Sequence, residues 1–137
     1  MIKKTTYSET ETENFAKEIA KLLKPKDVLC FTGGLGVGKT AFCRGLAVGL
    51  GCTDTVSSPT FAIVNLYSGK QKLAHFDMYR VNTEEDMYTS GFFDYIDEGA
   101  ILAVEWSENI IEFLDEPYIK IDIKRIDENT REIIIDG

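Results

Sequence analysis

Residues 33–40 read Gly33-Gly34-Leu35-Gly36-Val37-Gly38-Lys39-Thr40 and match the pattern G-x-x-x-x-G-K-[ST] of a phosphate-binding loop. The four glycines allow the backbone to curl so that successive N–H groups point at one anion. Lys39 adds a positive charge for the β- and γ-phosphates of a nucleotide, and Thr40 offers a hydroxyl to Mg²⁺. The stretch therefore predicts a nucleotide-phosphate site, provided that a buried strand precedes it and a helix follows it.

The sequence predicts both flanking elements. Residues 28–31 are a short apolar run, which is typical of a buried strand. After the loop, Phe42, Leu46 and Leu50 recur at the spacing of one helical face, and Gly51 stands where a helix would end. The alternative, an ordinary glycine-rich turn with an incidental lysine, explains neither flank.

Length and composition indicate one globular domain over residues 1–137, with 44% hydrophobic residues and no apolar stretch long enough to span a membrane. The N-terminus lacks the apolar region of a signal peptide. The three cysteines have no C-x-x-C spacing, so we expect free thiols in a cytoplasmic protein. The net charge of −8 argues against nucleic-acid binding by the chain alone, because neutralisation of phosphates supplies most of that affinity.

Hydrophobic periodicity predicts the remaining elements. A strand is expected at 4–7, a helix from about Thr10 to Pro25, and a polar loop at 52–59. Serine, glycine and lysine at 68–70 indicate a hairpin between strands at 60–67 and 71–78. The further expected elements are short helices at 83–96 and 107–114, and strands at 100–104, 119–124 and 131–135.

These elements predict an α/β fold. We expect a three-layer sandwich with a mixed, mostly parallel central sheet and antiparallel additions, because the two fully apolar strands imply a sheet covered on both faces. The nucleotide is expected at the carboxyl ends of the central strands. Gly45 and Gly49 in the helix after the loop are expected to allow close packing on the sheet.

Two acids directly follow apolar strands and are candidates for the metal site. Asp77 ends the strand at 73–76, and Glu105 ends the strand at 101–104. A carboxylate in such a place is costly to bury unless it is paired or bound to a metal. The alternatives are that Asp77 pairs with Arg80 and that Glu105 caps the next helix.

Three further residues have open roles. Thr60 is a candidate to close over the γ-phosphate as a switch threonine does, although Ser-Pro-Thr is also an ordinary strand entry. Trp106, the only tryptophan, either stacks on a base or serves packing. His75, the only histidine, is expected to be a structural hydrogen-bonding group rather than a base.

The motifs together resemble a known family. Gly33–Thr40, Ser58–Phe61, the His75–Arg80 motif H-x-D-x-Y-R and Val104–Trp106 appear in the order and spacing of the TsaE (YjeE) family of small bacterial P-loop ATPases. The resemblance covers nearly the whole chain. It implies a P-loop NTPase fold and action with the partners TsaB and TsaD in making threonylcarbamoyladenosine beside the anticodon of tRNA.

The resemblance also implies site roles. Gly33 to Ala41 would hold ATP, with Lys39 on the phosphates and Thr40 on Mg²⁺. Asp77 and Glu105 would be acids of the metal and water site, and Thr60 would be a switch residue. The other residues expected near the nucleotide are Trp106, Arg131 and one residue within Ser8–Thr10. Gly34 departs from the many relatives that carry Asp there, which removes a charge but leaves the backbone N–H groups in place.

The resulting hypothesis is slow Mg-ATP hydrolysis coupled to a partner complex, with tRNA contacted only through that complex. A small-molecule kinase is an alternative, although the only candidate lid, residues 83–96, is acidic and has no arginine. A GTP-dependent switch would need an N-K-x-D element, which is absent from the sequence. A nucleotide-dependent assembly factor without turnover keeps every binding residue, so the sequence leaves it open.

Overall fold

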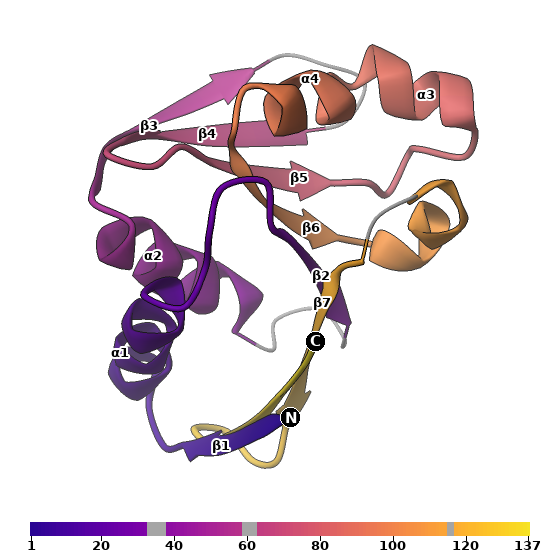
Figure 1. The fold of residues 1–137 in the computed structure, drawn as a ribbon. Helices are drawn as coiled ribbons and strands as arrows, with labels where there is room; N and C mark the ends of the chain where they lie inside the picture. Colours follow the sequence, from indigo (N-terminus) through magenta and orange to yellow (C-terminus); the bar gives the residue numbers. More distant parts are fainter. Residues whose placement is uncertain (33–37, 59–62, 115–116) are drawn as a thin grey trace.

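The fold is built on one sheet whose strands lie in the order β1-β8-β7-β2-β6-β5-β4-β3 (Figure 1). This computed structural model describes residues 1–32, 38–58, 63–114 and 117–137. The strands are β1 (Ile2–Thr6), β2 (Val28–Thr32), β3 (Cys52–Ser58), β4 (Ile63–Gly69), β5 (Leu73–Asp77), β6 (Ile101–Glu105), β7 (Ile119–Arg125) and β8 (Arg131–Asp136).

Parallel pairing is confined to the centre of the described sheet. β2 runs parallel to β6 and to β7, and β6 runs parallel to β5. On both sides of this centre the pairs are antiparallel, because β1 and β8 extend one edge while β4 and β3 extend the other. The sheet is therefore mixed, as predicted, but antiparallel pairs make up a larger part of it than predicted.

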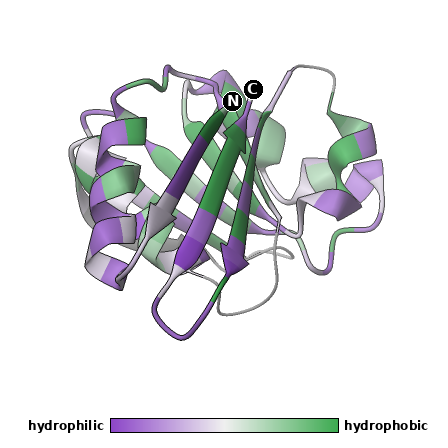
Figure 2. Cartoon of the chain, turned by 90° about the horizontal axis from the view of Figure 1, so that it is seen from below, coloured by the Kyte–Doolittle hydropathy of each residue, from purple (hydrophilic) through white to green (hydrophobic). Residues whose placement is uncertain are grey.

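Helices cover both faces of the sheet, as Figure 2 shows on its left and right sides. α1 (Glu9–Ala20) and α2 (Lys39–Gly49) pack on one face and share a core with Leu29 and Phe31 of β2. Val28 and Cys30 of the same strand belong to a second core on the opposite face. That core is covered by the short elements α3 (Glu84–Thr89), α4 (Phe92–Asp97), η1 (Ser107–Asn109) and η2 (Ile111–Phe113).

The glycines of α2 face α1 rather than the sheet, which corrects the expectation from sequence. A Cβ placed on Gly45 would lie 2.2 Å from the backbone oxygen of Glu13 and 2.7 Å from the Cβ of Ala16. A Cβ on Gly49 would lie 2.6 Å from the Cβ of Ala20. The two helices therefore pack closely because these positions carry no side chain.

Helix starts agree with the sequence signals. α1 begins at Glu9, and the Oγ of Ser8 accepts a hydrogen bond of 3.1 Å from the backbone N–H of Glu11. Thr83 caps α3 in the same manner, and Gly91 separates α3 from α4 in a left-handed conformation with φ 86°.

Two predicted segments are wrong. Residues 52–58 form the edge strand β3 instead of a loop, because β4 offers them an antiparallel partner despite their small polar side chains. Residues 107–114 form two 3-10 turns rather than one short helix. In the parts of the chain that the structure describes, no helix has the length and apolar character to cross a membrane.

Candidate functional site

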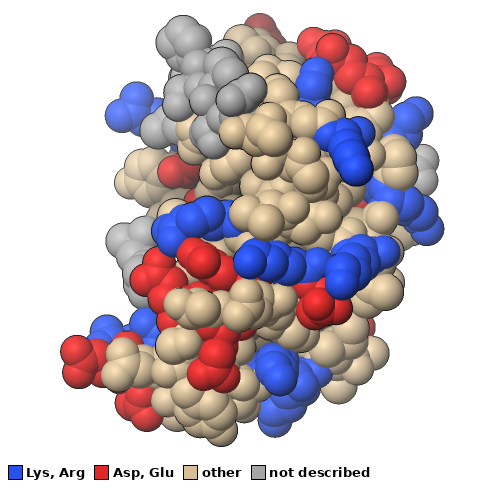
Figure 3. All heavy atoms as spheres, turned by 90° about the vertical axis from the view of Figure 1, so that its left-hand side faces the viewer, with Lys and Arg blue, Asp and Glu red and all other residues tan. Residues whose placement is uncertain are grey.

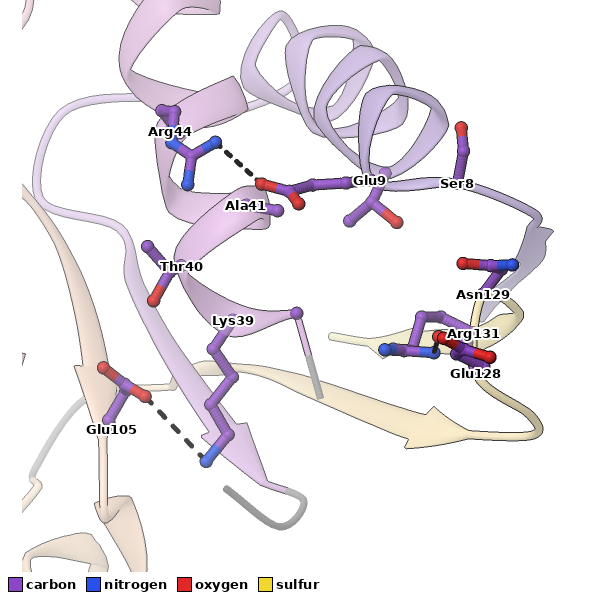
Figure 4. A pocket seen from close by; sticks show the side chains of 12 residues that line it. Ser8, Glu9, Lys39, Thr40, Ala41, Arg44, Glu105, Glu128, Asn129 and Arg131 are labelled. Atoms are coloured by element: carbon purple, nitrogen blue, oxygen red, sulfur yellow. Dashed lines mark hydrogen bonds and ion pairs between the residues drawn. The ribbon is translucent and has the colours of Figure 1, made fainter. Parts of the chain in front are cut away.

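A pocket of about 330 Å³ opens at the N-terminus of α2, between α1, β6 and the β7–β8 turn (Figure 4). Residues from each of these elements contribute to it. The pocket is lined by Ser8, Glu9, Thr12, Gly38, Lys39, Thr40, Ala41, Arg44, Glu105, Glu128, Asn129 and Arg131.

The N-terminus of α2 is fixed by backbone geometry. Gly38 has φ 105°, a left-handed conformation that L side chains rarely adopt, and its carbonyl accepts the first helical hydrogen bond, of 3.0 Å, from Phe42. The helix dipole and its free N–H groups then face the pocket, an arrangement that favours an anion. Lys39 follows directly and is only 9% exposed. Thr40 is exposed at the first turn of α2.

Three charged or polar side chains interact in a row: Lys39 on α2, Glu105 on β6 and His75 on β5. The Lys39 ammonium lies 4.0 Å from Oε1 of Glu105 at the end of β6. The other carboxylate oxygen, Oε2, lies 2.8 Å from Nε2 of His75 on β5. His75 is thus a hydrogen-bonding group, as predicted, and its partner is a candidate site residue.

The side chains in this row stabilise one another's charged forms. Burial lowers the pKa of His75, but its contacts with Cys43 and Glu105 outweigh burial and raise the pKa to about 10. The hydrogen bond from His75 holds the pKa of Glu105 below its ordinary value against the effect of burial, and the charges of His75 and Lys39 act in the same direction. Since a carboxylate with a lowered pKa is a weak base, Glu105 is better suited to orient water or ligate a cation than to remove a proton.

Asp77, the second acid expected at a strand end, lies beside Glu105. The two residues are register partners on the parallel strands β5 and β6. Because side chains alternate along a strand, Asp77 and Glu105 face the same side of the sheet as His75, the side covered by α2. Oδ1 of Asp77 accepts a hydrogen bond of 3.0 Å from the backbone N–H of Tyr79. Asp77 is not among the residues that line the pocket.

The opposite wall of the pocket comes from α1 and from the β7–β8 turn (Figure 4). Nη1 of Arg44 on α2 lies 2.9 Å from Oε1 of Glu9 and 2.5 Å from Oε1 of Glu13. Nη1 of Arg131 donates to backbone oxygens of the turn, including that of Asp127 at 2.9 Å. The Arg131 Nε lies 3.9 Å from where a Cβ on Gly38 would be, so Arg131 stands beside the start of α2.

Other predicted residues have different positions. Ala41 lines the pocket, whereas Trp106 lines a separate depression with Tyr79, Arg80, Asn82 and Asn109. The Trp106 ring packs edge-on against Tyr79, with ring centroids 4.9 Å apart. The residues Gly33, Gly34, Leu35, Gly36, Val37 and Thr60 lie outside the described residues.

Several pocket residues carried no functional signal in the sequence. Thr12, Glu128 and Asn129 line the pocket without belonging to any motif, whereas Ser8 and Glu9 fall within the segment that the resemblance had placed near the nucleotide. They meet because β1 pairs with β8, which places the start of α1 beside the β7–β8 turn. The turn joins the predicted strands at 119–124 and 131–135, but its place beside the start of α2 was not predicted.

Charge on the outer face of α1 and α2 is mixed. Figure 3 shows acidic and basic side chains interspersed there, with some basic side chains next to one another across the middle of the view. Among the described residues, no group of three or more His, Cys, Asp or Glu side chains could hold a metal ion by itself.

Comparison with known proteins gives a consistent result. Residues 6–133 match the family model "Threonylcarbamoyl adenosine biosynthesis protein TsaE". Three proteins named tRNA threonylcarbamoyladenosine biosynthesis protein TsaE are similar to the chain. Those of Rickettsia typhi, Bacillus subtilis and Aquifex aeolicus are 40%, 42% and 43% identical, over 93%, 96% and 93% of this chain and 89%, 83% and 90% of theirs.

A solved structure agrees with these relatives. The crystal structure of Bacillus subtilis YdiB matches with a TM-score of 0.75 and 38% identity, and the match covers 96% of this chain and 82% of that one. The family model and the relatives extend over both walls of the pocket, from α1 to β8. The chain therefore belongs to the TsaE family.

Proposed function

We propose that the chain binds Mg-ATP in this pocket and hydrolyses it slowly, as a P-loop ATPase that serves threonylcarbamoyl modification of tRNA. The observation that carries the proposal is the position of Lys39. It lies at the N-terminus of a helix that follows a glycine-rich loop, within 4.0 Å of an acid that ends a central strand. A cation, a helix dipole and an acid meeting at one point suit a triphosphate with its metal ion.

The pocket also suits the rest of a nucleotide. Its volume of about 330 Å³ and its length, from Lys39 to Arg131, leave room beyond the phosphates. The far end is lined by Ser8, Glu9 and Asn129, whose oxygens and amide suit the hydroxyl and amine groups of a nucleoside better than its phosphates. We therefore assign the phosphates to the Lys39 end and the nucleoside to the Ser8 end.

The residues at the Lys39 end fit a magnesium ion. The Thr40 hydroxyl is exposed at the start of α2, and the carboxylates of Glu105 and Asp77 end neighbouring strands on the same face. Magnesium in such sites takes one or two protein oxygens together with phosphate oxygens and water. When bound, it supplies Lewis-acid polarisation of the phosphoryl oxygens.

The chain's own groups then serve the attack of water on the γ-phosphorus. Lys39 neutralises charge on the phosphoryl oxygens as the bond to the leaving oxygen breaks. Glu105 accepts a hydrogen bond from the attacking water and thereby orients it, which agrees with the lowered pKa of this carboxyl. The proposal includes Gly33–Val37 and Thr60 as phosphate and switch residues, on the resemblance of their motifs.

The biological assignment rests on the family. The relatives are named for tRNA threonylcarbamoyladenosine biosynthesis, and we propose that this chain acts there with TsaB and TsaD. The net charge of −8 supports contact with tRNA through that complex and not directly. The three free cysteines fit a cytoplasmic location.

Phosphate release measured with and without the partner proteins tests the proposal. We expect slow release by the chain alone, dependent on magnesium, and faster release with TsaB and TsaD. Tight ATP binding without any release would favour the assembly factor, and absence of ATP binding would reject the site.

A further inference from the structure

We propose that His75 is a positioning residue for Glu105: it holds one carboxylate oxygen so that the other is presented to Lys39 and to the reacting water. This inference rests on the proposed function, because it assigns His75 a part in the same hydrolysis. The role is distinct from ATP binding, since His75 does not line the pocket.

The geometry divides the two oxygens of Glu105. Oε2 lies 2.8 Å from Nε2 of His75, within the range of a good hydrogen bond. Oε1 lies 4.0 Å from the ammonium of Lys39, and both Lys39 and Glu105 line the pocket. Oε2 therefore pairs with a residue of the sheet, and Oε1 is the oxygen nearer to Lys39 at the pocket.

His75 is a rigid support for this contact. Its backbone lies inside the sheet, where β5 pairs His75 with Asn65 of β4 on one side and with Ala103 of β6 on the other. His75 is buried, with 8% of the residue exposed, and its ring also contacts Cys43, which is itself fully buried on α2. The ring has little freedom to rotate, so the position of Nε2 is set by the sheet and by the helix that carries Lys39.

Glu105 by itself would be less well fixed. Its side chain is 23% exposed and has three rotatable bonds, so without His75 the carboxylate can adopt several rotamers. Mutation of a residue that orients a metal ligand typically lowers metal affinity or activity by about 10–100-fold. The expected consequence is a contribution to turnover, with little contribution to the affinity for ATP.

A matched pair of variants tests this role. His75→Gln places an amide N–H at the depth of Nε2 and keeps the donor, whereas His75→Asn is one methylene shorter and cannot reach Glu105. With the partner complex of the proposed function, we expect kcat of His75→Asn to fall about 10–100-fold with KM for ATP within about twofold, and His75→Gln to retain most of kcat. Thermal melting and the fluorescence of Trp106 establish that each variant is folded.

A double variant tests whether His75 acts through Glu105. If it does, His75→Asn combined with Glu105→Gln has the same kcat as Glu105→Gln alone. A double variant whose loss in kcat is the product of the two single losses would overturn the inference. So would a His75→Asn variant with wild-type kcat, or one in which only KM changes. If His75→Asn does not fold, His75→Leu fills the buried space without a donor and takes its place.

The proposed function and this inference fail in different ways. A wild-type chain that neither binds nor hydrolyses ATP would overturn both. A wild-type chain with normal turnover, together with an equally active His75→Asn, would overturn the inference alone.

Discussion

On the sheet side of the pocket, His75, Glu105 and Lys39 form a chain of charges in which His75 and Lys39 are each about 10% exposed at the side chain. On the helix side, Arg44 pairs with Glu9 and Glu13, but the Arg44 and Glu9 side chains are 51% and 66% exposed. The sheet side joins residues of β5, β6 and α2, whereas the helix side joins α1 to α2.

The difference in burial predicts a difference in energetics. Exposed ion pairs contribute about 0–1 kcal/mol because water and salt screen them. Removing one member of a buried charged pair costs more, since the remaining charge loses its partner without gaining water. The contact between α1 and α2 therefore depends on the glycines of α2 more than on Arg44, while the sheet side depends on its charges.

Replacing Lys39 removes the charge of the sheet side that contacts the ligand, and the expected effect on ATP affinity is the largest of these predictions. Lys39→Ala removes charge-assisted contacts to phosphate that are worth about 1.5–3 kcal/mol each, so the affinity for Mg-ATP should fall by about 100-fold or more. Isothermal titration calorimetry measures this change. Lys120→Ala, at an exposed position on β7, is the matched control. Normal ATP affinity in Lys39→Ala would show that the phosphates bind elsewhere.

Replacing Gly45 breaks the helix side by pushing α1 away from α2. In Gly45→Ala the new Cβ would overlap the Glu13 carbonyl at 2.2 Å, and we expect the free energy of unfolding to fall by about 2–3 kcal/mol. Because α1 carries Ser8 and Glu9 at the pocket, the affinity for ATP should weaken as well. Urea denaturation measures the first effect.

Val48→Ala, at a 55% exposed position of the same helix, controls for changes in helix propensity and should alter stability by less than about 0.5 kcal/mol. A Gly45→Ala protein as stable as wild type would mean that α1 can shift away at no cost, and the helix side would then be more adaptable than its packing indicates.

The sheet side was the more predictable part of the site, because its residues belong to local patterns. The loop and Lys39 are one continuous motif, and Asp77 and Glu105 follow apolar strands whose ends meet in a parallel sheet. The sequence also indicated that His75 forms a structural hydrogen bond, but not that its partner is Glu105. That contact depends on the register of β5 against β6, which no local pattern specifies.

The helix side could not be predicted from local patterns, because distant parts of the chain form it; only the family resemblance pointed to Arg131 and to a residue within Ser8–Thr10. The start of α1 and the β7–β8 turn are at opposite ends of the sequence and meet only through the pairing of β1 with β8. The edge strand β3 was missed for a related reason. Its Thr53, Thr55 and Val56 are β-branched and favour a strand, but the aspartate and serines among them favour a loop, and the partner strand β4 decides the conformation.

Raising the pH tests the buried charges of the sheet side in the protein without nucleotide. The pKa of His75 is about 10 in the fold, against 6.5 in its absence, so the associated stability is complete below pH 6.5 and is lost as the pH rises toward 10. The free energy of unfolding should therefore fall by about 1 kcal/mol per pH unit between about pH 7 and 9. Urea denaturation at several pH values measures the slope. His75→Gln cannot titrate and should show a smaller slope, and an equal slope in both proteins would contradict the assignment.

Replacing Arg44 has the smallest expected effect and measures the charges of the helix side. Arg44→Gln removes the ion pairs to Glu9 and Glu13, and the free energy of unfolding should fall by less than about 1 kcal/mol because these pairs are exposed. The loss should shrink further at about 1 M salt, where the screening length is about 3 Å. Urea denaturation at low and high salt gives both values, with Arg44→Lys as the control that keeps the charge. A loss that is large and independent of salt would mean that Arg44 stabilises the fold through packing of its side chain, and the contrast between the two sides would then be one of geometry rather than of burial.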